Sequence, residues 1–200
     1  SGFLQLRWAV SIRLRIPQPA IKPPPTRRPG YRNRRQTENN GLGNTGLENV
    51  HLSPWHFVLA RAYNWHRVDD GLFRSAQMYG GHIQPLLKHH GVATVINLRG
   101  ANPNSTWYYP ERAACEALKI TYLDQPLHSR RLPKQEVLAG LLEAFQSAAR
   151  PILIKCSGGA DRTALAAALF LLHSRGATAL PQARRQMALL PYLHLPKQYQ

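Results

Sequence analysis

Apolar runs separated by Gly, Pro and Asn predict alternating strands and helices from about residue 55 onward. Short runs of the type that strands favour occur at 72–74, 93–98, 120–123 and 151–154. Apolar residues at helical spacing predict helices at about 82–90, 110–118, 133–145, 164–172 and 180–190. This order predicts an α/β fold, a three-layer sandwich whose central, largely parallel sheet of four to five strands is flanked by helices.

Two of the predicted helices carry recognisable apolar faces. In the first, the apolar face is formed by Ala113, Ala114, Ala117 and Leu118. In the second, the stripe is formed by Val137, Leu138, Leu141, Leu142 and Phe145. Such faces indicate helices that pack on a sheet rather than helices surrounded by water.

The N-terminal part of the chain lacks this pattern. Its prolines come with arginines between residues 17 and 29, and a run rich in Asn and Gly follows at 39–46. Proline, low apolarity and like charge oppose a packed core. We therefore expect residues 1–50 to be a basic, Pro/Arg-rich, disordered segment and residues 51–200 to be the folded domain.

The net charge of +16 is unevenly distributed, with 20 Arg and 6 Lys in the chain. Residues 1–37 hold nine basic residues and no acidic one, which leaves 17 basic and 10 acidic residues, or +7, for the rest. A positive field attracts anionic ligands. The basic segment is therefore either a solvated tail or an arm for an anionic partner, such as nucleic acid, anionic lipid or an acidic protein.

A glycine-rich turn joins the last predicted strand to the helix that follows it. It reads Cys156-Ser-Gly-Gly-Ala-Asp-Arg162. Such a turn directs backbone N–H groups and a helix N-terminus at one point, which suits an anion and stabilises a thiolate. The guanidinium of Arg162 is a planar fork suited to phosphate. The alternative is a buried structural cysteine beside a surface arginine.

This turn, continued to Thr163, resembles the signature loop of cysteine-dependent protein tyrosine and dual-specificity phosphatases. The segments 71–77 and 95–100 are similar to those that precede the loop in bacterial members, and the resemblance spans about residues 64–195. It implies a phosphotyrosine phosphatase-like fold and hydrolysis of phosphomonoesters through a phosphocysteine, without metal or cofactor.

The resemblance implies a phosphorylated substrate, with a phosphoprotein as the first expectation. A non-protein substrate is the alternative within enzymes: an inositol phosphate, a phosphoinositide or an RNA 5′-phosphate. A catalytically weak phosphate-binding module, and nucleic-acid binding through the basic segment, are alternatives outside this class.

The resemblance also assigns roles within the loop. Cys156 is the expected nucleophile, and Arg162 is expected to bind two phosphate oxygens and stabilise the transition state. Thr163 corresponds to a hydroxyl that hydrogen-bonds the cysteine sulfur. The expected phosphate-binding backbone consists of Ser157, Gly158, Gly159, Ala160, Asp161 and Arg162. Both glycines are expected to let this backbone curl without a Cβ clash.

The proton donor for the leaving group is not obvious. Many relatives supply an aspartate from the loop after the preceding strand, but here residues 126–131 contain no carboxylate. Asp161 is the favoured candidate, with a precedent in relatives that carry an aspartate in the loop. Asp124, at a strand end, is the second candidate, and His128 or water is the third. Either carboxylate could instead be structural, through a helix dipole or an arginine pair.

Several residues around the loop are expected to support it. Lys155 stands where most relatives have histidine, and a cation there can favour a thiolate. Arg99 ends a strand expected beside the strand at 151–154, so it either supports the loop, touches the substrate or is a surface arginine at a strand end. The aromatic residues 107–109 could line the pocket, although core packing is the favoured interpretation.

The two cysteines, Cys115 and Cys156, do not form a disulfide framework. A reactive thiolate favours a reducing compartment, so the cytoplasm is the expected location. Residues 3–16 make a poor signal peptide because arginines interrupt them, and the chain begins at Ser1, so a longer natural N-terminus with a membrane anchor is compatible with it. We expect a monomer.

Overall fold

The structure is a computed structural model that describes residues 54–195. The described residues belong to one compact unit. The predicted basic segment, residues 1–50, lies outside the described residues. The expectation of an anionic partner concerns that segment.

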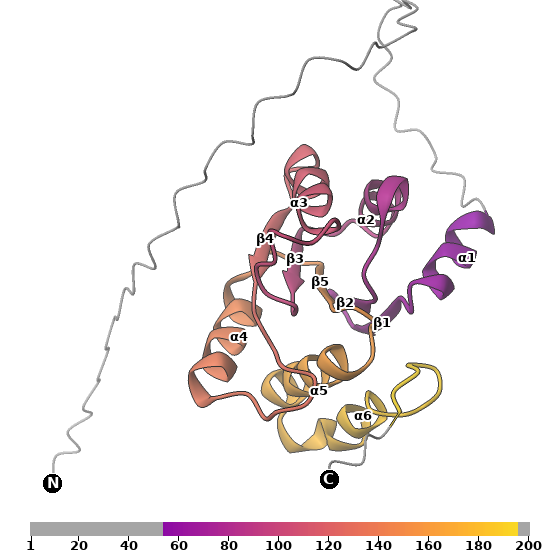
Figure 1. Cartoon of the computed structure of the whole chain (residues 1–200). Coiled ribbons are helices and arrows are strands. Elements are labelled where there is room, and N and C mark those ends of the chain that lie inside the picture. The colour runs from indigo at the N-terminus through magenta and orange to yellow at the C-terminus, as the bar shows by residue number, and fades with distance from the viewer. Residues whose placement is uncertain (1–53, 196–200) are drawn as a thin grey trace, which may run out of the picture. The chain divides into compact units, whose positions relative to one another are not determined.

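A five-stranded sheet forms the centre of the fold, in the order β1-β2-β5-β3-β4 (Figure 1). β1 runs antiparallel to β2, and the other neighbours are parallel. The strands are β1 (His66–Asp69), β2 (Leu72–Ser75), β3 (Thr94–Asn97), β4 (Thr121–Asp124) and β5 (Ile152–Lys155). Because β2, β3 and β5 are parallel, their carboxyl ends meet at one edge of the sheet, with β5 in the middle.

Helices cover both faces of the sheet. Figure 1 shows α2 and α3 on one side and α4, α5 and α6 on the other. The α-helices are α1 (Pro54–Ala62), α2 (Ile83–His89), α3 (Tyr108–Ala117), α4 (Gln135–Ser147), α5 (Asp161–Arg175) and α6 (Leu180–Arg185). Two short 3₁₀ turns, Gly80–His82 and Gly176–Ala179, precede α2 and α6. This arrangement confirms the predicted α/β class with a largely parallel sheet.

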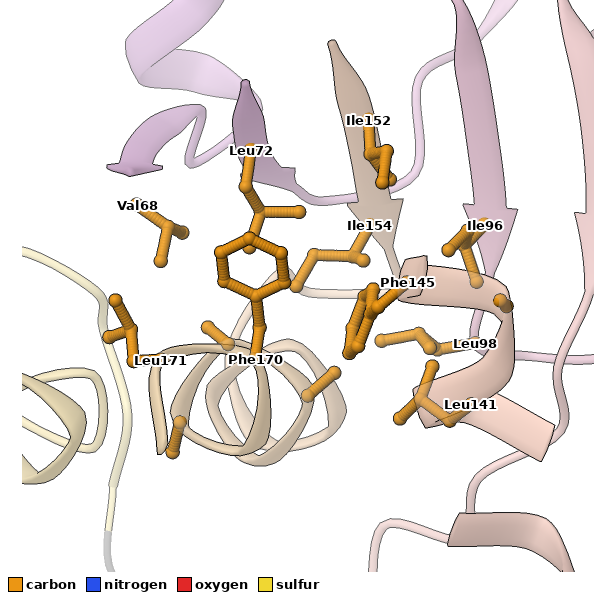
Figure 2. Close-up of a cluster of buried hydrophobic side chains, with 14 of the residues drawn as sticks. Val68, Leu72, Ile96, Leu98, Leu141, Phe145, Ile152, Ile154, Phe170 and Leu171 are labelled. Carbon is orange, nitrogen blue, oxygen red and sulfur yellow. The ribbon is translucent and has the colours of Figure 1, made fainter. Parts of the chain in front are cut away.

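One hydrophobic core lies between the sheet and α4 and α5 (Figure 2). Ile152 and Ile154 face this side from β5, since alternate residues of a strand point to the same face. Phe145 of α4 meets Phe170 of α5 edge to face, with ring centroids 5.2 Å apart. Residues 156–162 form the signature turn, and α5 begins at the end of this turn. The packing of α5 therefore fixes the helix whose N-terminus faces the turn.

A second core lies on the opposite face, beneath α2 and α3. Leu153 of β5 points into it, together with Val95 of β3 and Leu86 and Leu87 of α2. The central strand is therefore buried on both sides, as is usual in parallel sheets. Rigid packing on both faces holds the residue after β5, Cys156, in one position.

The predictions for individual elements differ from the structure in four places. Residues 54–62 and 66–69 form a helix and a strand that we did not predict, and the last helix ends at Arg185 rather than near residue 190. In α3, Ala113 and Ala117 are exposed. The buried face of α3 is instead formed by Tyr108, Glu111, Ala114 and Cys115. The predicted face is therefore confirmed for Ala114, and Leu118 packs partly buried against the same core. It was wrong for Ala113 and Ala117, because the buried face turns toward Glu111 instead.

By length and composition alone, the stretch Asp161–Arg185 could cross a membrane. In the structure it comprises α5, a 3₁₀ turn and α6. The apolar residues of α5 pack against the sheet and α4. The hydrophobicity of this stretch is therefore that of a core helix.

Candidate active site

The signature turn lies at the carboxyl end of β5 and leads directly into α5. Cys156 is only 3% exposed, and its N–H donates to the carbonyl of Ser75 at 3.3 Å. A pocket of about 180 Å³ opens over the turn. It is lined by Ser129, Cys156, Ser157, Gly158, Ala160, Asp161 and Arg162. Cys156 and Arg162, which sequence reasoning paired as nucleophile and clamp, therefore share one pocket at a helix N-terminus.

The two glycines of the turn are not equivalent. Gly159 has a φ of +64°, and a Cβ there would lie 2.6 Å from the Ala76 nitrogen and 2.8 Å from the Ser75 carbonyl carbon. At Gly158 a Cβ would meet no atom within 4 Å. The expectation that both glycines are needed to avoid clashes is therefore wrong for Gly158, where the space is open. Gly159 is required by both backbone conformation and close approach to β2.

Arg74, a fully buried residue of β2, holds the turn from behind. Its Nη2 donates to the carbonyls of Gly159 and Ala160, at 2.9 and 3.1 Å, and to the Thr163 hydroxyl at 3.1 Å. In a trans peptide the N–H points away from the C=O. Binding these carbonyls therefore directs the N–H groups of Ala160 and Asp161 to the opposite side, as an anion cradle requires.

Arg74 also places a charge beneath the nucleophile. Burial lowers the pKa of Arg74 to about 10, and attraction to Tyr192 and Cys156 opposes this shift. The guanidinium therefore stays protonated at neutral pH. A buried, charged arginine therefore stands close enough to Cys156 for the two groups to interact electrostatically.

Asn64 ties the turn to the C-terminal segment. Its Nδ2 donates to the carbonyls of Gly158 and Gly159, at 3.2 and 3.0 Å, and to the carbonyl of Tyr192 at 2.9 Å. The Tyr192 ring lies under the Arg74 guanidinium, 4.4 Å from its centroid. Residues from before β1 and after α6 thus fix the same turn.

Arg162 and Thr163 make contacts within the turn. Nη2 of Arg162 donates to the Ser157 hydroxyl at 2.8 Å, which holds the guanidinium at the pocket. The Thr163 hydroxyl donates to the carbonyl of Ala160 at 3.1 Å while it accepts from Arg74. These bonds give Thr163 a place in the support of the turn. Its expected bond to the Cys156 sulfur stays a prediction.

Lys155 is buried on the opposite side of the strand from the core with α5. Its ammonium forms an ion pair with Glu111 and donates to Gln77 Oε1 at 2.9 Å. It also lies 4.2 Å from the centroid of the Trp107 ring. Burial lowers the pKa of Lys155, and Glu111 opposes that shift. Lys155 was expected to act as a cation that favours the thiolate of the nucleophile. These contacts do not support that role, because Glu111 neutralises the charge of Lys155.

Gln77 connects this ion pair to the turn. Its backbone N–H donates to the carbonyl of Ser157 at 3.1 Å, and its side-chain Nε2 donates to Glu111 at 2.9 Å. Arg99 donates to Gln77 Oε1 at 3.1 Å and stacks on Trp107, 3.9 Å from the ring centroid. Arg99 therefore supports the turn through Gln77, and it does not line the pocket.

The three candidate proton donors are separated by the structure. Asp161 lines the pocket with Cys156. Asp124 lines neither the pocket nor the neighbouring cleft. Its Oδ1 accepts from Asn97 at 2.7 Å, and its Oδ2 accepts from the Tyr108 hydroxyl at 2.6 Å and pairs with Arg112 at 3.5 Å. Asp124 is thus engaged in structural bonds, which leaves Asp161 as the carboxylate at the pocket.

A larger cleft of about 660 Å³ adjoins the pocket and shares Ser129, Asp161 and Arg162 with it. His128, the third candidate donor, lines this cleft but not the pocket. His194 lines it too, and its Nε2 lies 3.8 Å from Oδ1 of Asp161. The C-terminal segment therefore brings a second titratable group to the favoured acid.

The aromatic residues 107–109 do not reach the site. Trp107 and Tyr108 are buried and Tyr109 is 61% exposed, and none of them lines the pocket or the cleft. Core packing, the favoured interpretation, is confirmed for Trp107 and Tyr108 and is wrong for Tyr109. Cys115, the second cysteine, is buried in α3, and burial raises its pKa to about 12, so it stays a neutral thiol.

Sequence reasoning assigned no role to the residues that hold the turn. These are Asn64, Arg74, Gln77, Glu111 and Tyr192. For Arg74, the only sequence feature that could have indicated a role was that a charged residue follows Leu72 and Phe73 in a predicted strand. The positive φ of Asn64, 49°, has no sequence signal beyond the tolerance of Asn for that conformation. Within residues 54–195, no cluster of three or more His, Cys, Asp or Glu side chains could hold a metal ion.

Comparisons with known proteins support the fold. No protein-family model matches the chain, and no curated protein matches it. A DUF442 protein of Shewanella putrefaciens CN-32 is 20% identical, with a TM-score of 0.50 over 66% of this chain and 82% of its own. That likeness, at this level of identity, confirms the predicted fold.

Two further solved structures resemble the chain less closely in three dimensions. TpbA of P. aeruginosa is 25% identical, with a TM-score of 0.49 over 63% of this chain and 73% of its own. The core catalytic domain of the PP-IP phosphatase SIW14 of S. cerevisiae is 17% identical, with a TM-score of 0.46 over 68% of this chain and 96% of its own.

Proposed function

We propose that the protein is a metal-independent phosphomonoester hydrolase that works through a phosphocysteine. One observation carries the proposal: Cys156, Arg162 and Asp161 line one pocket at the N-terminus of α5. The turn between them has its carbonyls held from behind by Arg74 and Asn64. This arrangement combines a nucleophile, an anion cradle, a bidentate clamp and a proton donor.

In the first step, the Cys156 sulfur attacks phosphorus in line with the leaving oxygen. A sulfur–phosphorus bond forms, the bond from phosphorus to the leaving oxygen breaks, and that oxygen takes the proton of Asp161. Backbone N–H groups and Arg162 stabilise the charge on the equatorial oxygens. In the second step, water attacks phosphorus, Asp161 accepts a proton from it, and inorganic phosphate leaves the restored thiolate.

The substrate class has two candidates. A phosphoprotein follows from the resemblance of the signature loop to protein tyrosine and dual-specificity phosphatases. A small phosphorylated molecule is favoured by a specific observation, namely that no Phe, Tyr or Trp among the described residues lines the pocket or the cleft while several basic side chains do. A phosphotyrosine ring would find no large aromatic side chain of the described residues to pack against there.

Hydrolysis of p-nitrophenyl phosphate in the presence of EDTA tests the proposal. The wild-type protein is expected to turn over, and Cys156→Ser is expected to be inactive. Activity that requires an added metal would contradict the thiolate mechanism. Binding of phosphate without turnover would favour the alternative of a phosphate-binding module.

A free nucleophilic thiol further suits a reducing compartment, which supports the cytoplasm as the proposed location.

A further inference from the structure

The cleft beside the pocket is continuous with it. The two share Ser129, Asp161 and Arg162, and the cleft of about 660 Å³ is several times larger than the pocket of about 180 Å³. A ligand whose phosphate lies on the signature turn therefore extends into the cleft with the rest of its structure. The walls of the cleft decide which substrates fit there.

The cleft is strongly basic. Among the described residues, its titratable lining consists of His128, Arg130, Arg131, Asp161, Arg162 and His194, of which only Asp161 is acidic. The two chain segments that supply the walls contain no other acid, because no Asp or Glu occurs at 125–135 or after 161. The positive potential therefore has little internal compensation.

Arg130 and Arg131 form no ion pair with a carboxylate in the described part of the chain. Other arginines do so where an acid is near: Arg67 pairs with Asp70, and Arg175 with Asp69. Both Arg130 and Arg131 are exposed and stand in the loop between β4 and α4, with donors available to a ligand. Two guanidinium forks on one wall suit a phosphate group, which accepts bidentate hydrogen bonds.

We propose that Arg130 and Arg131, with His128 beside them, form a subsite for a second phosphate group on the substrate. This subsite rests on the proposed function, because it assumes that a first phosphate occupies the pocket at Cys156. The substrate is then a bisphosphorylated or more highly phosphorylated molecule. Recognition comes from charge on both groups rather than from stacking on a ring.

Alkanediol bisphosphates of increasing chain length, each compared with the alkyl monophosphate of the same length, are suitable probes. Their binding is measured by calorimetry on Cys156→Ser, and by competition against p-nitrophenyl phosphate on the active protein. We expect one chain length to bind about tenfold more tightly than its monophosphate, the effect of about one additional charged hydrogen bond. Arg130→Gln/Arg131→Gln should bring that ratio close to one.

Arg184→Gln/Arg185→Gln is the matched control. It removes the same charge from two adjacent, exposed arginines at the end of α6 that do not line the cleft. This control should keep the bisphosphate preference. A preference that survives loss of Arg130 and Arg131, or no preference at any chain length, would overturn the subsite.

The outcomes separate the subsite from the proposed function. If calorimetry shows a bisphosphate preference that depends on Arg130 and Arg131, but no substrate is hydrolysed, the subsite is supported and the proposed hydrolase function is contradicted. Hydrolysis without a bisphosphate preference supports the enzyme and contradicts the subsite. Absence of phosphate binding to both the wild-type protein and Cys156→Ser contradicts both.

Discussion

Nε2 of His194 lies 3.8 Å from Oδ1 of Asp161. The C-terminal segment thus contacts the aspartate that we propose as proton donor. Tyr192 anchors this segment, since its carbonyl accepts from Asn64 and its hydroxyl accepts from Gln186 at 3.2 Å. A protonated histidine at this distance attracts the carboxylate electrostatically and so influences how the carboxyl group is oriented.

The first prediction concerns this pair and the leaving group. Asp161→Asn should lower kcat/KM, which reports the first step, about a hundredfold or more for an alkyl phosphate, whose leaving oxygen needs a proton, and much less for p-nitrophenyl phosphate. His194→Ala should show the same selectivity with a smaller loss, about tenfold, because it acts through Asp161.

His173→Ala is the control for the histidine, because His173 is an exposed residue of α5 that contacts Gln146 and does not line the cleft. Its kinetics should match the wild type for both substrates. An equal loss on both substrates in His194→Ala would indicate a merely structural role for His194. Full activity of Asp161→Asn on the alkyl phosphate would remove Asp161 as the acid.

The second prediction compares the two glycines of the turn. Gly159→Ala should cost about 2 kcal/mol or more of unfolding free energy, because the new Cβ meets the backbone of β2 in a left-handed conformation. Gly158→Ala should change stability by less than about 0.5 kcal/mol, because its Cβ would meet open space. Urea denaturation of both variants measures the difference, and equal effects would contradict this account of the turn.

The third prediction concerns Arg74. A lysine lacks the planar fork with which Arg74 binds two carbonyls and a hydroxyl. Arg74→Lys should therefore disturb the anion cradle and lower kcat/KM for every leaving group. Inhibition by inorganic phosphate should weaken in parallel. Arg67→Lys, at an exposed ion pair of β1, is the control and should retain both. Unchanged phosphate inhibition in Arg74→Lys would show that the cradle does not depend on Arg74.

The fourth prediction concerns the buried pair of Lys155 and Glu111. Glu111→Gln leaves a buried ammonium without its counter-charge and should cost about 3–5 kcal/mol of unfolding free energy at neutral pH. The double variant Lys155→Met/Glu111→Leu should recover most of that loss, because it removes both charges. A double variant that is as unstable as the single one would contradict the prediction.

The same pair predicts a pH dependence for Glu111→Gln. Burial lowers the pKa of Lys155 in the folded protein, whereas in the unfolded chain it titrates near its ordinary value. Between the two values the unfolded chain binds more protons, so the stability of the variant should rise with pH toward the alkaline range. Urea midpoints measured across that range, with the double variant as reference, test the sign.

The sequence predicted the parallel sheet and the turn well, because both leave local patterns. The run 151–154 and the two glycines at 158 and 159 mark a buried strand and a tight turn by themselves. The residues that hold the turn left no such pattern. Tyr192 is distant in the chain from Asn64 and Arg74, and the three meet only because the C-terminal segment packs against β2 and the residues before β1.

Lys155 is a second case in which the local sequence did not predict the tertiary contacts of a side chain. Its position next to the nucleophile suggested an electrostatic role, which local sequence supports. Strand alternation instead turns its side chain to the face covered by α3, where Glu111 neutralises it. A carboxylate in the first turn of a helix gave no sign that it would be buried, and the same omission placed Ala113 and Ala117 on the buried face of α3.

The central claim is that Cys156 carries the phosphoryl group during turnover. Acid quench of Asp161→Asn during hydrolysis of p-nitrophenyl phosphate, followed by mass spectrometry of the peptide that contains Cys156, tests it most directly. The variant is suited to trapping because the second step needs a base at residue 161. We predict a phosphoryl adduct on Cys156 and none in the Cys156→Ser/Asp161→Asn protein. Turnover by the wild type that persists in Cys156→Ser, or an adduct on another residue, would contradict the claim.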